Sequence, residues 1–396
     1  MNSLTFRITT ALLTFVIGVA VATAWVFDSR KPVIQPVSLL ETGNDDSSLE
    51  MVFVLDTTGS MGGLIEGAKQ RIWGIVNEVM QSASHPAVRI GLVAYRDRGD
   101  QYVTQVLPLT NDLDKVYSTL MDYQAGGGGD TPEDVRQALT DGVRRAGWSQ
   151  SSSRTAQIIF LVGDAPPHQD YRDEQDTAIT ATEAVQKGMI VNTIQCGSLA
   201  GTKEVWEVIA QRGQGQYFSI AQDGGVQAIT TPYDEQLGQL ANKLGGTYVA
   251  YGGGAGTEGE RYREVRKEMA DVAEARVATS APLSAKADRA LNKAVNADAY
   301  IGDLLQSIEN GSVKLESVKD EDLPADMRKL SPEGRKQEIE KRLNERRELR
   351  AQIVSLSKQR GEFIASERKK NGGKQTGFDA AVATALKEQL SRKGIK

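Results

Sequence analysis

A short apolar segment that changes abruptly into polar residues constrains the fold of this chain more than any other feature. Residues 51–55 (MVFVL) are uniformly apolar and are followed at once by Asp56, Thr58 and Ser60. An apolar run of this length, rich in β-branched and aromatic residues, predicts a strand buried on both faces, which is typical of a parallel sheet. In open α/β sheets, ligands bind at the carboxyl ends of the strands. The three oxygen-bearing side chains therefore stand where we expect a ligand.

Strand-like and helix-like segments alternate after this point. Apolar runs predict further strands at 88–95, 102–107, 155–162, 189–196 and 216–220. A short polar turn joins the first two of these, which implies an antiparallel hairpin with an edge strand. Periodic apolar residues predict helices at 64–84, 113–123, 132–146, 174–187, 204–211 and 235–244, the third of them capped by Thr131. The order predicts a doubly wound α/β domain with a mostly parallel sheet and one antiparallel edge strand.

The composition changes after residue 245, where charged and alanine-rich segments predict a helical C-terminal region. Helices are expected at 261–278, 285–308, 335–370 and 378–390, arranged as a helical hairpin or a coiled-coil-like element. The alternating charges from Arg335 to Arg350 predict a solvated helix face with i,i+4 ion pairs. We therefore expect five parts: a signal peptide or N-terminal membrane anchor at 1–31, a tether at 32–49, the α/β domain at 50–245, a glycine-rich linker at 246–260 and the charged helical region at 261–396.

The N-terminal segment predicts a location outside the cytoplasm. Arg7 precedes a largely apolar run from Ala11 to Phe27, and residues 22–24 (ATA) have the pattern that signal peptidase cleaves. The run is short for a spanning helix but lies at the edge of the usual range. Either a cleaved signal or a single retained anchor would place the remainder in the cell envelope, periplasmic or otherwise extracytoplasmic.

The composition excludes several classes of function. The net charge is −5, from 47 basic and 52 acidic residues, which gives no case for nucleic-acid binding. One cysteine, Cys196, and two histidines, His85 and His168, leave no internal disulfide and make a Cys/His zinc site a poor fit. We expect Cys196 to be a small core residue and His168 to lie on the surface.

Three loops would carry the chemistry of the α/β domain. Asp56, Thr58 and Ser60 follow the first strand, Thr131 precedes a helix, and Asp164 follows the strand at 155–162. If that strand lies beside the first, two carboxylates and three hydroxyls meet at one edge of the sheet. This set has too little charge for a tight Ca²⁺ cage and suits an octahedral Mg²⁺ that keeps water ligands. Such an ion retains a position where a carboxylate of a partner could bind.

The same residues carry a resemblance to a known family. The motif Asp56-x-Thr58-x-Ser60, with Thr131 and Asp164 in matching loops, resembles the metal-ion-dependent adhesion site (MIDAS) of von Willebrand factor type A (VWA) domains, and residues 56–61 (DTTGSM) resemble a bacterial and hemicentin-like variant. The resemblance covers about residues 50–245 and implies a Rossmann-like fold. It implies that Thr58, Ser60 and Thr131 coordinate Mg²⁺, or another hard cation such as Mn²⁺ or Ca²⁺, by their hydroxyls. Asp56 and Asp164 would act largely through water, and a protein partner would supply the last acidic ligand.

Two alternatives to a metal-dependent adhesion or assembly module remain. The segment from Phe53 to Ser60 also resembles the first motif of haloacid-dehalogenase-type phosphatases, in which Asp56 would be the nucleophile beside Mg²⁺. Against this, Thr58 replaces the second aspartate of that motif, and the next helix starts directly after Gly63. The family resemblance favours binding without catalysis. In the other alternative, the protein is a scaffold that acts mainly through its helical tail.

Overall fold

The structure is a computed structural model that describes residues 47–80, 86–225, 229–296, 299–370 and 377–395. The predicted signal or anchor at 1–31, and all but the end of the predicted tether, lie outside the described residues. Within the described ranges, no helix is both long enough and apolar enough to cross a membrane.

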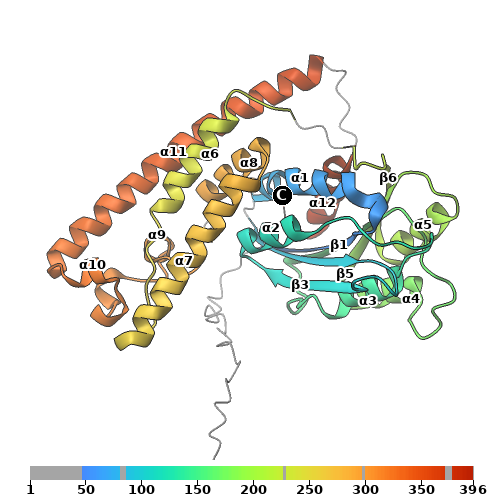
Figure 1. Ribbon diagram of the computed structural model, residues 1–396, viewed down its shortest axis with the longest axis horizontal. Coiled ribbons are helices and arrows are strands. Elements are labelled where there is room, and N and C mark those ends of the chain that lie inside the picture. The colour runs from blue at the N-terminus through green and yellow to red at the C-terminus, as the bar shows by residue number, and fades with distance from the viewer. Residues whose placement is uncertain (1–46, 81–85, 226–228, 297–298, 371–376, 396) are drawn as a thin grey trace, which may run out of the picture. The chain divides into compact units, whose positions relative to one another are not determined.

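A six-stranded sheet in the order β3-β2-β1-β4-β5-β6 forms the centre of the α/β part (Figure 1). Its strands are β1 (Ser48–Asp56), β2 (Ala87–Tyr95), β3 (Thr104–Thr110), β4 (Thr155–Gly163), β5 (Met189–Cys196) and β6 (Gln214–Ile220). Neighbours pair in parallel, except for β3, which pairs antiparallel with β2 at the edge. The predicted sheet is therefore confirmed, and β4 does lie beside β1.

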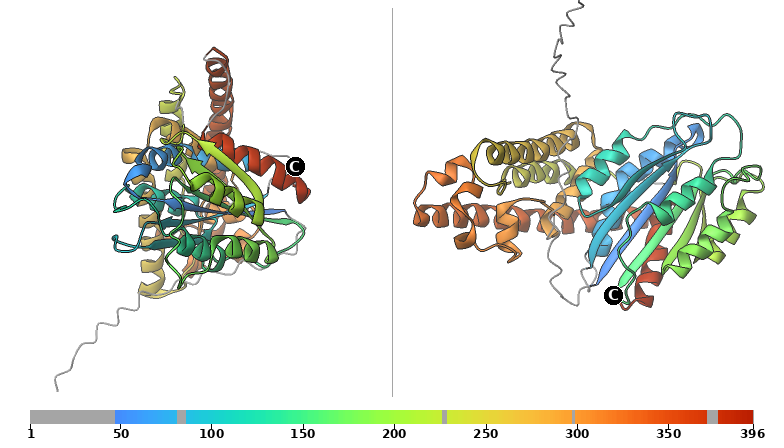
Figure 2. Two further views of the ribbon diagram at one scale, coloured as in Figure 1. Left: turned by 90° about the vertical axis from the view of Figure 1, so that its right-hand side faces the viewer. Right: turned by 90° about the horizontal axis from the view of Figure 1, so that it is seen from below.

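Helices cover both faces of the sheet, which explains the apolar runs at 51–55 in β1 and 158–162 in β4. In β1, Met51 and Phe53 belong to one core cluster while Val52 and Val54 belong to the other, as the two-residue period of a strand requires. The first face is covered by α1 (Gly62–Met80), α2 (Leu113–Asp122) and α12 (Phe378–Arg392), and the second by α3 (Val135–Arg144), α4 (Thr177–Gln186) and α5 (Thr202–Arg212) (Figure 2). Cys196 is fully buried, as expected.

The last helix, α12, packs on the sheet although it follows the helical region in the chain. The backbone N–H of Phe378 donates to Gly224 O at 2.9 Å, just after β6. The ring centroid of Phe378 lies 5.9 Å from that of Phe53 on β1. Residues 229–370 thus form an insertion between β6 and α12. The helix α12 contacts β4, β5 and β6 of the sheet. This helix lies beyond residue 245, where we predicted the α/β domain to end.

The inserted residues form a helical region with apolar clusters of its own. It comprises α6 (Asp234–Gly246), α7 (Gly256–Ser280), α8 (Leu283–Val295), α9 (Leu304–Glu309), α10 (Ala325–Arg328), α11 (Pro332–Lys370) and the 3₁₀ turns at Leu315–Ser317 and Asp320–Asp322. We predicted that residues 235–244 close the α/β domain. Instead, Leu237 and Leu244 of α6 pack with Ala287 of α8 and Ile353 of α11. Their apolar face is buried by other helices of the insertion.

The charged face of α11 was predicted to be solvated, but the structure buries part of it. Arg346 has no exposed side-chain surface and forms an ion pair with Asp303, which is equally buried. Arg350 reaches Glu309 on α9 at 2.6 Å, whereas Arg342 forms the expected i,i+4 pair with Glu338 at 2.7 Å. Sequence spacing reveals partners on the same helix but not those that packing brings from other helices.

Candidate metal centre

The carboxyl ends of β1 and β4 bring the first and third predicted loops together. Leu55 pairs with Val162 in the parallel register, so Asp56 and Asp164 follow at the same edge of the sheet. Gly163, which precedes Asp164, closely approaches the first carboxylate: a Cβ at this position would lie 3.1 Å from Asp56 Oδ2. Glycine therefore leaves the space beside that oxygen.

Asp56 is a completely buried carboxylate with only one of its oxygens satisfied. Its Oδ1 accepts hydrogen bonds from the backbone N–H of Thr58 at 2.8 Å and from Thr58 Oγ1 at 2.7 Å. Its Oδ2 is buried and has no hydrogen-bond partner. Burial raises the pKa of Asp56 to about 7, helped by the negative charge of Asp164 and opposed by the hydrogen bonds from Thr58. A buried acceptor without a partner lowers the stability of the fold, so Asp56 Oδ2 is a candidate position for a bound cation.

The two hydroxyls of the first loop lie side by side at this carboxylate. Thr58 is buried and its Oγ1 lies 3.4 Å from Ser60 Oγ, which is on an exposed residue. Hydroxyl side chains just before a helix can also serve as helix caps. Thr58 precedes the 3₁₀ turn Gly59–Met61, yet its side chain forms no capping hydrogen bond and binds Asp56 instead. The local contacts therefore favour a role in the site over a role as a cap.

The glycine-rich loop before α3 is attached to the first loop by its backbone. Gly126 N donates to Thr57 O at 3.1 Å, and Gly59 N donates to Gly127 O at 3.3 Å. Thr131, further along, is exposed and forms no hydrogen bond within the described part of the chain. The structure thus joins the loop to the site, but it does not bring the Thr131 hydroxyl into contact with the other predicted ligands.

Helix α3 begins later than predicted, and Thr131 is not its cap. Asp134 is the N-cap, and its Oδ1 accepts from Gln137 N at 3.0 Å. The preceding Glu133 forms a parallel bridge with Pro167, and its N–H donates to Pro166 O at 3.1 Å. This pairing occupies the backbone of a residue that the capping pattern assigned to the helix, so tertiary contact overrides the local sequence preference.

Glu133 is a third buried carboxylate of the site, and the sequence analysis missed it. Its side chain is 4% exposed and its Oε2 has no hydrogen-bond partner. Burial raises the pKa of Glu133 to about 9, and the carboxylates of Asp56, Asp97, Asp100 and Asp164 raise it further. All four of these neighbouring charges are negative. A residue that the sequence assigned to the first turn of a helix thus lies among acidic side chains.

Gln222, in the segment after β6, connects the first and third loops. Its Nε2 donates to Asp164 Oδ2 at 2.6 Å and to Ser60 O at 3.4 Å. The third loop is also fixed from α5, where Thr202 Oγ1 donates to Asp164 O at 3.2 Å and Trp206 Nε1 donates to Ala165 O at 3.1 Å. No motif surrounds Gln222 in the sequence, so only the fold could reveal its position.

The residues present fit a hard divalent cation. Two buried carboxylate oxygens, on Asp56 and Glu133, have no hydrogen-bond partner. Asp164 and the hydroxyls of Thr58 and Ser60 add further oxygen donors, the type that Mg²⁺ and Ca²⁺ prefer. Crowded carboxylates raise one another's pKa, and a cation relieves that repulsion. Three carboxylates, rather than the two predicted, supply the negative charge.

His168 was expected on the surface, but it is buried beside this centre. It is 7% exposed, and its backbone N–H donates to Glu133 O at 3.3 Å. Backbone hydrogen bonds of Glu133 therefore join the second loop to the third, and they place His168 beside Glu133.

Comparison with known proteins identifies the α/β part. Residues 50–232 match the family model of the von Willebrand factor A domain. This segment is a von Willebrand factor A domain. The match ends before α6, which agrees with the packing of that helix in the helical region. Domains of this family are protein-interaction or adhesion modules, whereas the assignment of residues 56–61 to a particular MIDAS variant stays a prediction.

Individual relatives match limited parts of their own sequences. Mouse (Mus musculus) von Willebrand factor A domain-containing protein 7 is 41% identical over 193 residues, which is 49% of this chain and 20% of that protein. An ariadne-like RING finger protein of Acanthamoeba polyphaga mimivirus is 25% identical over 161 residues, which is 40% of this chain and 15% of that protein. Among solved structures, the SpRpn10 VWA domain is similar with a TM-score of 0.35 and 16% identity, covering 46% of this chain and 91% of that one.

Proposed function

We propose that the VWA domain binds a partner protein through a divalent cation, Mg²⁺ in the first instance, held at the carboxyl edge of the sheet. Thr58 and Ser60 would coordinate the ion by their hydroxyls, with Asp56, Glu133 and Asp164 directly or through water. An acidic side chain of the partner would complete the coordination. The predicted participation of Thr131 remains part of this proposal.

The observation that carries the proposal is the pair of buried, unpartnered oxygens, Asp56 Oδ2 and Glu133 Oε2. Burial raises the pKa of both carboxyl groups, and the charge of Asp56 raises that of Glu133 further, so the two ionised groups destabilise the protein unless something compensates them. A divalent cation does so, and it leaves coordination positions for an external carboxylate. We place the module outside the cytoplasm on the sequence of residues 1–31 alone.

The environment of Asp56 supports binding over phosphoryl transfer. A nucleophilic carboxylate must reach its substrate, whereas Asp56 has no exposed surface and its Oδ1 accepts two hydrogen bonds from Thr58. Purified protein should therefore not hydrolyse p-nitrophenyl phosphate in the presence of Mg²⁺. Hydrolysis that Asp56→Asn abolished would contradict the binding-module proposal.

Calorimetric titration with Mg²⁺ tests the metal centre directly. We expect one binding event for the unaltered chain and its loss in the double variant Asp56→Ala, Asp164→Ala. Glu207→Gln is the matched control, because Glu207 is an exposed carboxylate on α5 whose partner is Lys203 at 3.7 Å. Absence of Mg²⁺ binding, or binding unchanged in the double variant, would overturn the proposal.

A capture experiment from envelope extract separates this proposal from a scaffold that acts through its helices. Because Phe378 N bonds Gly224 O, a short glycine-serine linker can replace residues 229–376 and keep α12. Truncation within the glycine-rich segment near Gly252 would instead remove α12 from the core. Capture that survives the internal deletion and is lost with EDTA supports the metal face. Capture lost with the deletion and insensitive to EDTA supports the scaffold.

A further inference from the structure

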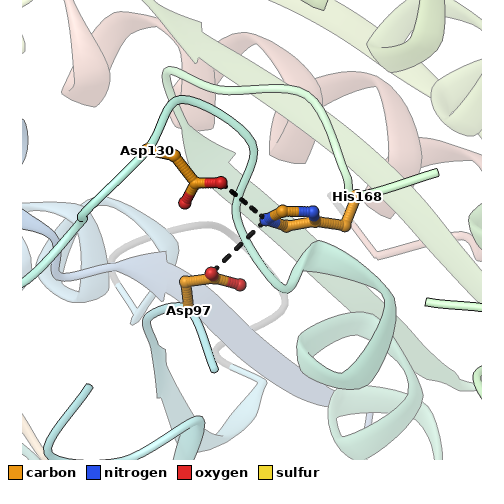
Figure 3. Close-up of side chains that lie close together, drawn as sticks. All are labelled: Asp97, Asp130 and His168. Atoms are coloured by element: carbon orange, nitrogen blue, oxygen red, sulfur yellow. Dashed lines mark ion pairs between the residues drawn. The ribbon is translucent and has the colours of Figure 1, made fainter. Parts of the chain in front are cut away.

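A second group of potential metal ligands lies beside the centre around Asp56, Glu133 and Asp164, which we call the carboxyl-edge centre. Asp97 follows β2, Asp130 ends the glycine-rich loop, and His168 lies in the loop after β4. One ligand atom from each of the three residues lies within 4.8 Å of the others. Figure 3 shows both carboxylates directed towards the same ring nitrogen of His168. Three segments far apart in the sequence thus place two oxygens and one nitrogen around a common point.

The imidazole of His168 has the orientation of a metal ligand. Its Nδ1 lies 2.9 Å from Asp170 Oδ1, within hydrogen-bonding distance. Its Nε2 is buried and forms no hydrogen bond, although Asp97 Oδ2 lies at 3.3 Å and Asp130 Oδ2 at 3.9 Å. Metal-bound histidines commonly use one ring nitrogen for a carboxylate and the other for the ion. The nitrogen left unsatisfied here is the one that faces both remaining acids.

Tyr171 holds two of the three groups in place. Its ring stacks on that of His168, with centroids 4.0 Å apart and an interplanar angle of 7°. Its hydroxyl donates to both oxygens of Asp97, at 2.9 and 3.0 Å. Contacts of this kind around a ligand set fix the orientation of each donor before an ion arrives.

Arg98, which stacks on Tyr171, pairs with other acids. Arg98 pairs with Asp134 at 3.4 Å and with Asp173 at 3.0 Å, and it also pairs with Glu174. Its guanidinium carbon lies 4.0 Å from the centre of the Tyr171 ring. Among the described residues, the ion pairs of Asp97 and Asp130 are both with His168. A site with two carboxylates therefore relies on one imidazole for charge compensation.

We propose that Asp97, Asp130 and His168 form a second cation site, which takes a divalent transition metal such as Zn²⁺. One imidazole and two carboxylates suit Zn²⁺ better than Mg²⁺, which favours oxygen ligands alone. Bonds of about 2.0–2.2 Å place tetrahedral ligand atoms about 3.3–3.6 Å apart. The separations of 3.3 and 3.9 Å from Nε2 agree with this geometry after a small movement of the exposed Asp130. A fourth position would hold water or a partner's side chain.

The test is titration of the full chain with Zn²⁺ in buffer that contains excess Mg²⁺, so that the carboxyl-edge centre is saturated. We expect one Zn²⁺ site, with affinity reduced at least tenfold by His168→Gln and by Asp130→Asn. The side chain of Asp130 is 62% exposed, so its variant keeps the fold even if the histidine variant does not. Glu207→Gln, at a surface pair on α5, is expected to leave Zn²⁺ affinity unchanged.

Co²⁺ provides a second readout, because its visible absorption reports nitrogen coordination and a low coordination number. We expect a band in the unaltered chain that Asp130→Asn and His168→Gln weaken. Absence of Zn²⁺ binding, or unchanged affinity in both variants, would overturn the proposal and leave His168 as an imidazolium that pairs with the acids. Zn²⁺ binding that Asp56→Ala abolishes and Asp130→Asn retains would also overturn it, since the ion would then occupy the carboxyl-edge centre. Mg²⁺ titration of the same proteins tests the proposed function separately.

Discussion

The candidate metal centre and the helical region both bury charged side chains, but only in the described part of the helical region does every buried carboxylate lie beside a cation. In the helical region, Asp303 pairs with Arg346. Arg360 likewise bonds Asp234 and Asp288, each at 2.6 Å. The candidate metal centre has three buried carboxylates, on Asp56, Glu133 and Asp164, and two acceptor oxygens without partners. A complete set of ion pairs stabilises the fold itself, whereas an incomplete one is suited to receive a cation from outside.

Two carboxylates of the α/β part show what a neighbouring cation does to the pKa of a buried acid. Asp114, on α2, is largely buried, which raises its pKa, but the charges of Arg289 and Lys293 on α8 hold the pKa well below its usual range. Burial without a cation raises the pKa of Asp56 to about 7. Similar burial therefore gives opposite shifts, and the difference is the presence of an arginine and a lysine.

Removal of one member of a complete pair should have the largest effect. Arg346→Ala leaves Asp303 buried without its cation, so we expect a loss of about 3–5 kcal/mol in the free energy of unfolding. Arg347→Ala is the control, because Arg347 is 63% exposed on the same helix and should change stability by no more than about 0.5 kcal/mol. Urea denaturation measures both. Equal effects of the two variants would remove the distinction between the regions.

Removal of a carboxylate from the incomplete set should have the opposite sign. The folded pKa of Asp56 is raised, so its contribution to stability is fully present below pH 4 and is lost as the pH rises towards 7. A shift from 3.8 to about 7 corresponds to about 4 kcal/mol. In EDTA at pH 8, Asp56→Asn should therefore be more stable than the unaltered chain by up to this amount, and the difference should vanish near pH 4. A less stable variant at pH 8 would show that Asp56 already has a stabilising partner.

Mg²⁺ should stabilise the unaltered chain above pH 7 and do so less at lower pH, because binding must displace a proton from Asp56. At a concentration one hundred times Kd, the gain is about 2.7 kcal/mol. Glu133→Gln should reduce it, because this variant removes a carboxyl group that can give up its proton and bind the ion. Thermal unfolding with and without Mg²⁺ at pH 6 and 8 measures the effect. An increment independent of pH would argue against proton displacement.

Gln222→Ala should weaken Mg²⁺ binding by about tenfold, as is usual for groups that orient a metal ligand. The variant loses the bonds to Asp164 Oδ2 and Ser60 O but alters no proposed ligand. Gln222→Glu can keep the side-chain length but cannot donate, and it is expected to behave like the alanine variant towards Asp164. Calorimetry is the measurement, and unchanged affinity in both variants would exclude a positioning role.

The smallest effect is expected at the surface. The pair between Arg144 on α3 and Glu183 on α4 is 2.6 Å long, with 44% and 22% of the side chains exposed. Solvent screening limits such a pair to about 1 kcal/mol or less. Arg144→Ala should therefore change stability by less than this in low salt and not at all in 0.5 M NaCl. A larger loss of stability would mean that this ion pair also stabilises the loops of the candidate metal centre.

Sequence periodicity predicted the sheet well because strands buried on both faces must be apolar throughout. The strand at 51–55 followed from that rule, the short turn predicted the hairpin with its antiparallel edge, and both are present in the structure. That β4 lies beside β1 was a condition of the predicted site, and the structure meets it. The first loop was also accessible, because Asp56, Thr58 and Ser60 are adjacent in sequence. The helix cap at Thr131 was wrong because the bridge between Glu133 and Pro167 decides the local backbone.

Local chemistry thus determined which oxygens follow β1 and that the chain folds around a parallel sheet, since both depend on residues a few positions apart. The tertiary structure alone decided that α12 returns to the sheet, that Glu133 and Gln222 join Asp56 and Asp164, and that His168 is buried against Asp97. These contacts link segments whose separation in sequence leaves no periodic pattern. Whether a buried carboxylate has a cation beside it depends on such contacts, and that balance distinguishes a metal centre from a structural ion pair.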